Sequence, residues 1–443
     1  MFTLNEISSL LGTSSVGNIP LTGLCIDSRK VDKGNLFVAI RGDRFDGHDF
    51  INEAVKNGAV AILCSDGRQS QVPEILVPDT TQALAEIAKY HREQLNCNTV
   101  ALTGSNGKTT VKEMIAAILP KPSHATPGNL NNHIGVPLSV LKLTPEHRYA
   151  VFELGANHIG EIAHTVSIVK PKVTLINNIA PAHIGEFGSI EGVARTKGEI
   201  HQGLASDGTA IVNADDDYAH FWDSALTGKK TVRFSRTTND ADVFARDIHF
   251  NELGFATFTL VLPIGEAKIQ LQVPGAHNVS NSLAAAASTY ALGIDLDAIV
   301  SGLNKFTGVS GRMTFRSGKN KSTVIDDTYN ANLRSVLSAL DVLATHKGRR
   351  IFVFGDMGEL GSWTQEHHQE VGKAARSHGI DALMTCGIHS QYTASAFGST
   401  GKHYASQDAL IEDLLKELDA NTTVLVKGSR SAAMEKIVHQ LLG

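Results

Sequence analysis

The chain has 443 residues, of which 42% are hydrophobic and 19% are charged, which is the composition of a globular protein with several domains. Its formal net charge of -5 excludes the basic surface of a protein that binds nucleic acid or an anionic membrane. We expect neither a leader peptide nor a membrane span, and the four scattered cysteines predict neither a disulfide framework nor a zinc site.

Residues 1–96 are predicted to form a small α/β domain. Short apolar runs at Leu36–Ile40 and Ala59–Cys64 indicate strands, and a helical pattern at Asn52–Lys56 lies between them.

A central domain, residues 97–312, is expected to contain a mostly parallel sheet. Strand Thr99–Thr103 leads into a glycine-bearing turn and then a helix from Lys108 to about Leu119. Further strands are predicted at Tyr149–Leu154, Val173–Ile179 and Thr209–Asn213. The stretch 231–273 is rich in strand patterns, including Phe255–Leu262 and Lys268–Val273, and an alanine-rich helix follows at Ser280–Leu292.

Residues 313–443 show strands and helices in regular alternation, which predicts a Rossmann-like α/β domain. The expected elements are strand Ser322–Ile325, helix Arg334–His346, strand Arg350–Phe354, helix Thr364–His378, strand Ala382–Cys386, strand Thr423–Val426 and a last helix. The fold class is therefore three-domain α/β, with clefts between domains that can enclose substrates.

The turn after the first central strand has the pattern of a phosphate-binding loop. It consists of Gly104, Ser105, Asn106, Gly107, Lys108, Thr109 and Thr110. Its backbone N–H groups and the helix start favour a polyphosphate, Lys108 would reach the terminal phosphates, and the Thr109 hydroxyl suits Mg²⁺. The strict pattern requires glycine at the position of Leu102, so the match is irregular. An incidental glycine turn is the competing interpretation.

Three charged or metal-binding side chains are candidates at or near strand ends. Glu153 ends an apolar strand, where a carboxylate suits Mg²⁺, although a solvated glutamate is an equal alternative. His183 follows another strand end, and a lone histidine is more often structural. Lys197 has the pattern of a surface lysine.

Two further segments carry polar side chains in suggestive positions. Asn278 and Asn281 can project amides from one helical face, and an amide can satisfy adenine, but the residues alone favour a helix N-cap at Asn278 or Ser280. The adjacent Asp326 and Asp327 indicate either a working cleft face or a solvated turn.

Taken in order, these segments resemble the Mur ligases. The similarity includes Asp27-Ser28-Arg29, the phosphate loop, Gly128-Asn129-Leu130-Asn131-Asn132, Glu153-Leu154-Gly155-Ala156-Asn157, Lys197-Gly198-Glu199, His277-Asn278, Asp326 to Asn332 and Phe354-Gly355-Asp356-Met357-Gly358-Glu359-Leu360. No Asp-Asn-Pro-Arg run, typical of the members that add the third amino acid, occurs in the last domain, which favours the branch that adds D-alanyl-D-alanine.

The resemblance implies roles for individual residues. Lys108 and the loop would hold ATP, with Asn278 at adenine and Arg312, Asp327 and Tyr329 near the nucleotide. It implies two Mg²⁺ ions, on Thr109 and Glu153 and near His183, and a Lys197 that is carbamoylated by CO₂. The residues implied to act on the other substrates are Ser28, Arg29, Asn132, Asn330, Asn332 and Asp356. One departure is Leu333, where the family commonly has proline, and we expect a changed turn there.

The implied reaction is the ATP-dependent joining of D-alanyl-D-alanine to UDP-N-acetylmuramoyl-tripeptide through an acyl-phosphate, by a cytoplasmic monomer. It would supply the pentapeptide precursor of peptidoglycan. Three alternatives stay open: a folylpolyglutamate synthetase, which forms the same kind of bond; a P-loop ATPase that moves partners; and an inactive scaffold. An amine acceptor would distinguish a ligase from the ATPase.

Overall fold

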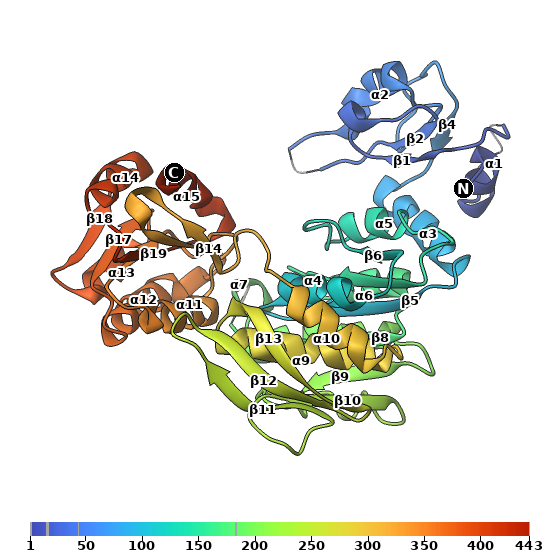
Figure 1. Cartoon of the computed structure of the whole chain (residues 1–443). Helices are drawn as coiled ribbons and strands as arrows, with labels where there is room; N and C mark the ends of the chain where they lie inside the picture. The colour runs from blue at the N-terminus through green and yellow to red at the C-terminus, as the bar shows by residue number, and fades with distance from the viewer. Residues whose placement is uncertain (1, 15–16, 43, 182–183, 443) are drawn as a thin grey trace. The chain divides into compact units, whose positions relative to one another are not determined.

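The computed structural model describes residues 2–14, 17–42, 44–181 and 184–442, and the chain forms two compact units (Figure 1). The first unit comprises residues 1–101, 121–155 and 161–171, and the second comprises 102–120, 156–160 and 172–443. These two units are not the three domains predicted from the sequence, so they do not test the boundaries at 96 and 312. Those boundaries stay predictions.

The first unit begins with a four-stranded sheet of order β1-β2-β3-β4 in which all neighbours are parallel. Its helices and strands are α1 Leu4–Leu10, β1 Gly23–Cys25, β2 Asn35–Val38, α2 Ile51–Asn57, β3 Ala61–Cys64, β4 Glu74–Leu76, α3 Thr80–Glu93, β6 Ser123–Ala125, α5 Gly135–Val140, β7 Tyr149–Glu153 and α6 Glu161–Val169.

Both faces of this small sheet are buried, which explains the unbroken apolar run of β2. Leu36 packs in one core cluster with Leu84 of α3, whereas Phe37 packs in another with Ile51 of α2. A parallel strand covered on both sides has no polar face. Its sequence is therefore a continuous apolar run and not an alternation of apolar and polar residues. The predicted α/β character of this region is confirmed.

A nine-stranded sheet of order β13-β12-β11-β10-β9-β8-β5-β7-β6 carries the predicted nucleotide-binding core. Strand β5 Asn98–Thr103 leads through a turn to α4 Lys108–Ile118. The other elements, all in the second unit, are β8 Val173–Ile176, α7 Ile184–Phe187, α8 Ile190–Gly198, β9 Thr209–Asn213, β10 Lys230–Ser235, β11 Val243–Phe250, β12 Phe255–Leu262, β13 Gly265–Pro274, α9 Ala276–Ala291 and α10 Leu296–Lys305. Helix α9 packs on β8 to β11 and against α4 and α10.

Two expectations for this region need correction. The strand predicted at Val173–Ile179 ends at Ile176, because the next two residues, both asparagines, turn the chain and use their side chains in hydrogen bonds. The alanine-rich helix begins at Ala276, with Gly275 as its N-cap and no side-chain cap bond. Neither Asn278 nor Ser280 is therefore an N-cap.

The remainder of the second unit has a six-stranded sheet of order β14-β15-β19-β16-β17-β18, parallel except for β14. Its elements are β14 Thr314–Ser317, β15 Thr323–Asp327, α11 Leu333–Thr345, β16 Arg349–Phe354, α12 Thr364–Ser377, β17 Ala382–Cys386, α13 Gln391–Phe397, β18 Gly401–Tyr404, α14 Gln407–Lys416, β19 Thr422–Lys427 and α15 Glu435–Leu441.

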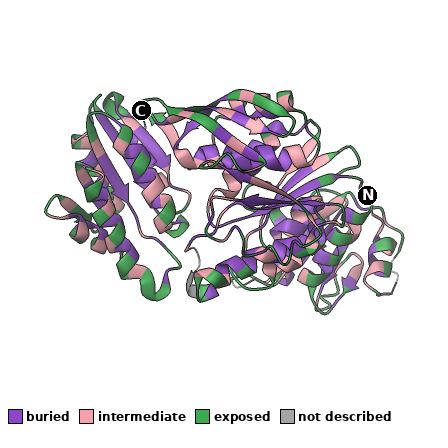
Figure 2. Ribbon diagram, turned by 90° about the horizontal axis from the view of Figure 1, so that it is seen from below, coloured by how far each residue is buried: buried purple, intermediate pink, exposed green. Residues whose placement is uncertain are grey.

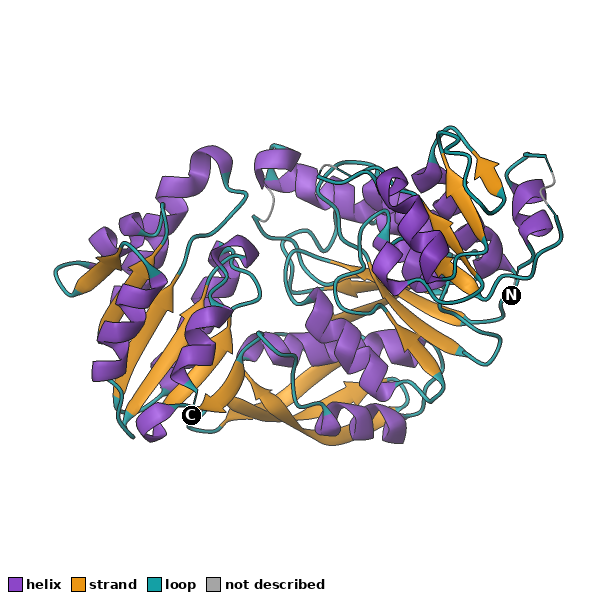
Figure 3. Ribbon diagram, turned by 90° about the horizontal axis from the view of Figure 1, so that it is seen from above, coloured by secondary structure: helices purple, strands orange, loops and turns teal. Residues whose placement is uncertain are grey.

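Helices cover both faces of this last sheet (Figure 3). Leu340 of α11 and Val371 of α12 belong to one buried cluster, and Leu414 of α14 and Ile437 of α15 belong to the other. The strands between them are buried along most of their length (Figure 2). This doubly wound arrangement confirms the predicted Rossmann-like fold and brings the carboxyl ends of β15, β19 and β16 to one edge.

Candidate active site

The predicted phosphate loop lies between β5 and α4, as the sequence indicates. Gly104 and Gly107 both have positive φ, at 151° and 77°. A Cβ at Gly107 would lie 2.5 Å from Asn281 Oδ1 and 2.6 Å from Asn177 Nδ2, so only glycine fits here. Lys108 Nζ donates to the Gly104 carbonyl at 2.7 Å, which folds the side chain back over the loop.

Three residues that the sequence assigns to the nucleotide meet at the start of α4. Arg312 Nη2 donates to the Thr109 hydroxyl at 3.0 Å, and its guanidinium carbon lies 4.2 Å from the centre of the Tyr329 ring. The stacked ring and the hydroxyl hold the guanidinium in one orientation. A positive group is thereby fixed beside the loop where phosphates are expected.

Glu153 is the last residue of β7 and lies in the first unit. Its side chain is 3% exposed. Asn131 Nδ2 donates to Oε1 at 2.8 Å, whereas Oε2 is buried with no hydrogen-bond partner among the described residues. A buried carboxylate oxygen without a donor is costly unless a cation approaches it, so the residue fits a metal ligand better than a solvated strand end.

Lys197, in α8, is buried rather than on the surface, so the surface interpretation of this residue is wrong. The ion pairs of the described residues do not include it. Burial, and then the charge of Lys108, hold the pKa of the Lys197 ammonium well below its ordinary value. A neutral amine is a nucleophile, so this site suits reaction with CO₂. His183 lies outside the described residues.

Asp327 ends β15 and is ion-paired with a lysine that sequence reasoning missed. Lys427, at the end of β19, is 2% exposed, and its Nζ donates to Asp327 Oδ2 at 2.6 Å and to the Asn330 carbonyl at 2.9 Å. The neighbouring Asp326 is also buried and accepts from the Thr328 hydroxyl at 2.7 Å. The alternative of a solvated turn is therefore wrong. The sequence signal that could have identified this residue is a lysine at the end of a buried apolar strand.

Three more residues predicted to meet substrate already make hydrogen bonds within the protein. Asn332 caps α11 and donates to Asn106 Oδ1 at 2.7 Å, so it does reach the phosphate loop. The Asp356 carboxylate accepts three backbone N–H groups from residues 388–390, at 2.7 to 3.0 Å. The Asn132 side chain accepts from the Gly135 amide at 2.8 Å and holds the entry to α5.

In the first unit, the predicted substrate residues lie on a short helical turn. Ser28 is buried and donates to Glu53 Oε2 at 2.5 Å. Arg29 is exposed and pairs with Asp27, with Nε 2.8 Å from Oδ1. Arg29 is thus available to a ligand, whereas Ser28 is tied to α2.

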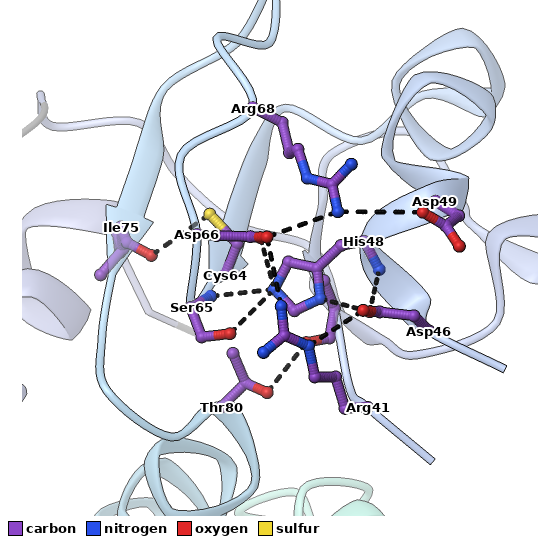
Figure 4. A network of polar contacts seen from close by, with 11 residues as sticks. Arg41, Asp46, His48, Asp49, Cys64, Ser65, Asp66, Arg68, Ile75 and Thr80 are labelled. Carbon is purple, nitrogen blue, oxygen red and sulfur yellow. Dashed lines mark hydrogen bonds and ion pairs between the residues drawn. The ribbon is translucent and has the colours of Figure 1, made fainter. Parts of the chain in front are cut away.

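A nearby polar network around His48 was not predicted (Figure 4). The ring is buried, and its Nε2 accepts from the Ser65 amide at 2.9 Å while Nδ1 lies 2.6 Å from Asp46 Oδ1. This pairing places the proton on Nδ1, which donates to Asp46. Arg41 Nε also donates to Asp46, at 2.9 Å. The network fastens the segment after β2 to the end of β3.

Models of known families match almost the whole chain. The Mur ligase family catalytic domain matches residues 20–92, the Mur ligase middle domain matches 102–289, and the Mur ligase glutamate ligase domain matches 311–430. The chain belongs to the Mur ligase family. The order of these three matches follows the three predicted domains of a Mur ligase.

Individual Mur ligases are similar over their full length. The chain is 45% identical, over 99% of its length and 98% of the relative, to the UDP-N-acetylmuramoyl-tripeptide–D-alanyl-D-alanine ligase of Escherichia coli K12. The ligase of the same name from Haemophilus influenzae is 40% identical over 98% of this chain and 97% of its own.

Solved Mur ligase structures have the same fold. A crystal structure of MurF from Acinetobacter baumannii matches with a TM-score of 0.92 and 35% identity over 99% of this chain and 98% of its own. MurF of Thermotoga maritima in complex with ADP matches with a TM-score of 0.83 and 27% identity, over 96% and 98%. A folylpolyglutamate synthase of Mycobacterium tuberculosis, at 17% identity and a TM-score of 0.62 over 81% and 94%, shares the fold alone.

Proposed function

We propose that this Mur ligase joins D-alanyl-D-alanine to UDP-N-acetylmuramoyl-tripeptide with the hydrolysis of ATP, making the pentapeptide precursor of peptidoglycan. The single observation that carries the proposal is the 45% identity, over 99% of the chain, to a relative with that name. The folylpolyglutamate alternative has only a shared fold in its favour. The full-length similarity to ligases also favours a ligase over the ATPase and scaffold alternatives.

The chemistry proceeds in two steps. The terminal carboxylate of the tripeptide attacks the γ-phosphorus of ATP and displaces ADP, which gives an acyl-phosphate. The amine of D-alanyl-D-alanine then attacks the acyl carbon, loses a proton and displaces inorganic phosphate. Lys108 and the loop amides stabilise the charge that gathers on the phosphoryl oxygens, and the held substrates need little covalent help from the protein.

Glu153 and Thr109 are the proposed protein ligands of one Mg²⁺ ion, and His183, which lies outside the described residues, is proposed as a residue of the second metal site. Glu153 qualifies because its buried Oε2 has no donor among the described residues, and Thr109 because it lies in the first turn of α4, beside the phosphate loop. Magnesium bound to ATP usually takes few protein ligands. Accordingly, the described residues contain no group of three or more acidic, histidine or cysteine side chains able to hold a metal alone. When bound, Mg²⁺ neutralises phosphate charge.

Lys197 is the proposed site of carbamoylation. Its neutral amine would attack CO₂ and release a proton, leaving a carbamate anion that supports the second ion from the position of a buried lysine. Without that conversion, the amine would bring no negative charge to a metal ion. Burial and the charge of Lys108 lower the pKa of Lys197, which raises the fraction of the neutral, reactive amine.

The other predicted residues have proposed places around the substrates. Arg29 and Ser28 lie on the UDP-sugar side, with Asn132, Asn330, Asn332 and Asp356 toward the peptide and the amine. Asn278 is proposed at adenine, and Arg312, Tyr329 and Asp327 act at the phosphates. No helix in the described part of the chain is long and apolar enough to cross a membrane. We place the reaction in the cytoplasm, where its nucleotide-linked substrates are made, and propose a monomer.

The test is phosphate release coupled to product formation. Purified protein receives ATP, Mg²⁺, UDP-muramoyl-tripeptide and D-alanyl-D-alanine, and the product is identified by mass. We expect phosphate release to require all components, and Lys108→Ala to lose at least a hundredfold in rate, which corresponds to about 3 kcal/mol of transition-state stabilisation. The exposed Lys305→Ala is the matched control. Phosphate release without a new peptide bond would favour the ATPase alternative.

A further inference from the structure

A chain of buried asparagine side chains runs from the start of α9 to the phosphate loop. Asn278 Nδ2 donates to the Pro274 carbonyl at 2.7 Å, and its Oδ1 accepts from Asn281 Nδ2 at 3.0 Å. Asn281 Oδ1 accepts from Asn177 Nδ2 at 3.0 Å. Asn177 Nδ2 also donates to the backbone carbonyl of Asn106, inside the loop, at 2.9 Å.

Each of these side chains makes two hydrogen bonds: Asn278 and Asn281 use both ends of the amide, whereas Asn177 uses Nδ2 for both. The exposed fractions of Asn177, Asn278 and Asn281 are 2%, 4% and 5%. Asn213 Nδ2 donates to the Asn177 carbonyl at 2.9 Å, which anchors that residue to the end of β9. Because an amide has a distinct donor and acceptor end, the order of bonds leaves only one orientation for each member. Burial makes any unmade bond costly, so the chain is stiff.

The last link of the chain controls one peptide of the phosphate loop. The C=O and N–H of a trans peptide point in opposite directions. Holding the Asn106 carbonyl against Asn177 Nδ2, with Asn178 Nδ2 donating to the same oxygen at 3.0 Å, therefore fixes the direction of the Gly107 N–H. Gly107 is the position where a peptide flip would be easiest, since glycine tolerates many φ and ψ values.

We propose that Asn177 and Asn281 are positioning residues that keep the Asn106–Gly107 peptide turned so that its N–H, and not its carbonyl oxygen, faces the β- and γ-phosphates. A flipped peptide would present a negative dipole end to the polyphosphate. The close packing of both amides around the Gly107 Cα supports this assignment, because a Cβ there would collide with both. The proposal rests on the phosphate loop being the ATP site.

The competing interpretation is that Asn281 reads the adenine base directly, beside Asn278, and does not act on the loop through Asn177. Their amide groups are already bonded to each other, and one of them is bonded onward to Asn177. Direct reading would have to use the second N–H or the second lone pair of these amides, because the first of each is already bonded. The two interpretations differ in which part of the nucleotide the protein senses through Asn281: the base or the phosphates.

The experiment measures binding of ATP, ADP, AMP and ITP, each with Mg²⁺, by calorimetry on the full chain. The variants are Asn281→Ala and Asn177→Ala. Ser288→Ala, which removes a buried hydroxyl that bonds within α9, is the matched control. We expect ATP and ADP to bind about three- to tenfold more weakly to each asparagine variant, which is the range for one or two net hydrogen bonds.

AMP binding should change by less than twofold, and the ratio of ATP to ITP affinity should stay at its wild-type value. The double variant should lose less than the product of the single losses, because the two residues share a bond. Loss of the ATP-to-ITP preference would overturn the proposal in favour of base reading. Equal weakening of ATP and AMP, or no weakening at all, would overturn it as well.

Two further measurements keep the outcome decisive. Thermal unfolding of each variant shows whether it folds, and Asn281→Ser and Asn177→Ser replace any variant that does not. Lys108→Ala separates this proposal from the one on which it rests: if Lys108→Ala binds ATP as tightly as the wild type, the phosphate loop assignment fails first. If Lys108→Ala loses ATP and Asn281→Ala does not, only the positioning role fails.

Discussion

Lys197 illustrates how burial changes the chemistry of a single side chain. A solvated lysine is almost fully protonated at neutral pH and reacts poorly with CO₂. Burial lowers the pKa of Lys197, and Lys108 lowers it further, so more of the amine is neutral. The resulting carbamate would be an anion in a place where the unmodified chain has an amine.

We predict a carbamate signal on this residue. Protein equilibrated with ¹³C-labelled bicarbonate should give one carbamate carbon resonance that is absent from Lys197→Arg, because the guanidinium stays protonated and cannot attack CO₂. Ligase activity of the wild type should fall after CO₂ is removed and return when bicarbonate is added. Lys305→Arg, at an exposed position, is the control. A wild-type spectrum identical to that of Lys197→Arg would rule the modification out.

The buried His201 should make the free energy of unfolding depend on pH. It is 8% exposed, its Nδ1 lies 3.0 Å from the Thr174 hydroxyl, and burial lowers the pKa of His201 to about 4. The unfolded chain binds this proton near pH 6.5, whereas the folded chain does not. The stabilising contribution is therefore complete above about pH 6.5 and is lost as the pH falls toward 4.

The expected loss is about 3 kcal/mol across that window. Urea unfolding of the wild type at pH 7.5 and pH 5 should show about 2 kcal/mol of this loss, because pH 5 lies inside the window. His201→Phe removes the titrating group but keeps a ring of similar size, so its stability should change less between the two pH values. His249→Gln, on an exposed part of β11, should behave as the wild type does. An unchanged pH dependence in His201→Phe would show that other groups dominate.

At the scale of an element, Asn332 has two roles at the start of α11. Its Oδ1 accepts from the Ser335 amide at 3.0 Å and caps the helix, while its Nδ2 donates to Asn106 of the phosphate loop at 2.7 Å. Leu333 is the first residue of the helix. The helix begins there without the proline common in the family, because the capping box supplies the start signal.

Two substitutions separate the capping role of Asn332 from its contact with Asn106. Asn332→Ala should lower the free energy of unfolding by about 1 kcal/mol and also weaken ATP turnover, since it removes both the cap and the contact. Asn332→Asp keeps the capping oxygen but has no donor for Asn106, so its stability should match the wild type while turnover stays reduced. Chemical denaturation and steady-state kinetics test the pair. Full activity in Asn332→Asp would show that the Asn106 contact has no role.

The sequence predicted most elements because their signals are local. The run Thr99–Thr103 followed by a glycine turn and Lys108 predicted β5, the loop and α4, and all three are present. The start of α9 was wrong by four residues, because Gly275 begins that helix without a side-chain cap and left no signal at Ala276. Lys427 was missed because its partner Asp327 is one hundred positions away, and such pairings depend on the strand order.

The site could be predicted in part for the same reason. An acidic residue at a strand end, such as Glu153, can be recognised in the sequence as a candidate ligand. Whether one of its oxygens lacks a hydrogen-bond donor depends on residues that are distant in sequence. The Asn278–Asn281–Asn177 chain is likewise invisible in the sequence, because it joins α9 to the end of β8. Local patterns therefore identify the phosphate loop, and only packing reveals what holds it.

At the scale of the whole molecule, the two compact units should respond differently to nucleotide. The phosphate loop, Arg312 and the asparagine chain all belong to the second unit. A ligand that binds only the folded state stabilises the parts it contacts, by about 2.7 kcal/mol at one hundred times its Kd. A non-hydrolysable ATP analogue with Mg²⁺ should therefore slow amide hydrogen exchange most in residues 102–120, 172–180 and 274–291.

Exchange in residues 20–90, which contain the small sheet and the His48 network, should change little, because that part is proposed to hold the UDP-linked substrate and not ATP. Addition of UDP-muramoyl-tripeptide without nucleotide should give the opposite pattern, with protection around Ser28 and Arg29. Lys108→Ala should lose the nucleotide effect and keep the substrate effect. Equal protection of both regions by the ATP analogue alone would contradict this division, since it would mean that nucleotide binding orders the whole chain at once.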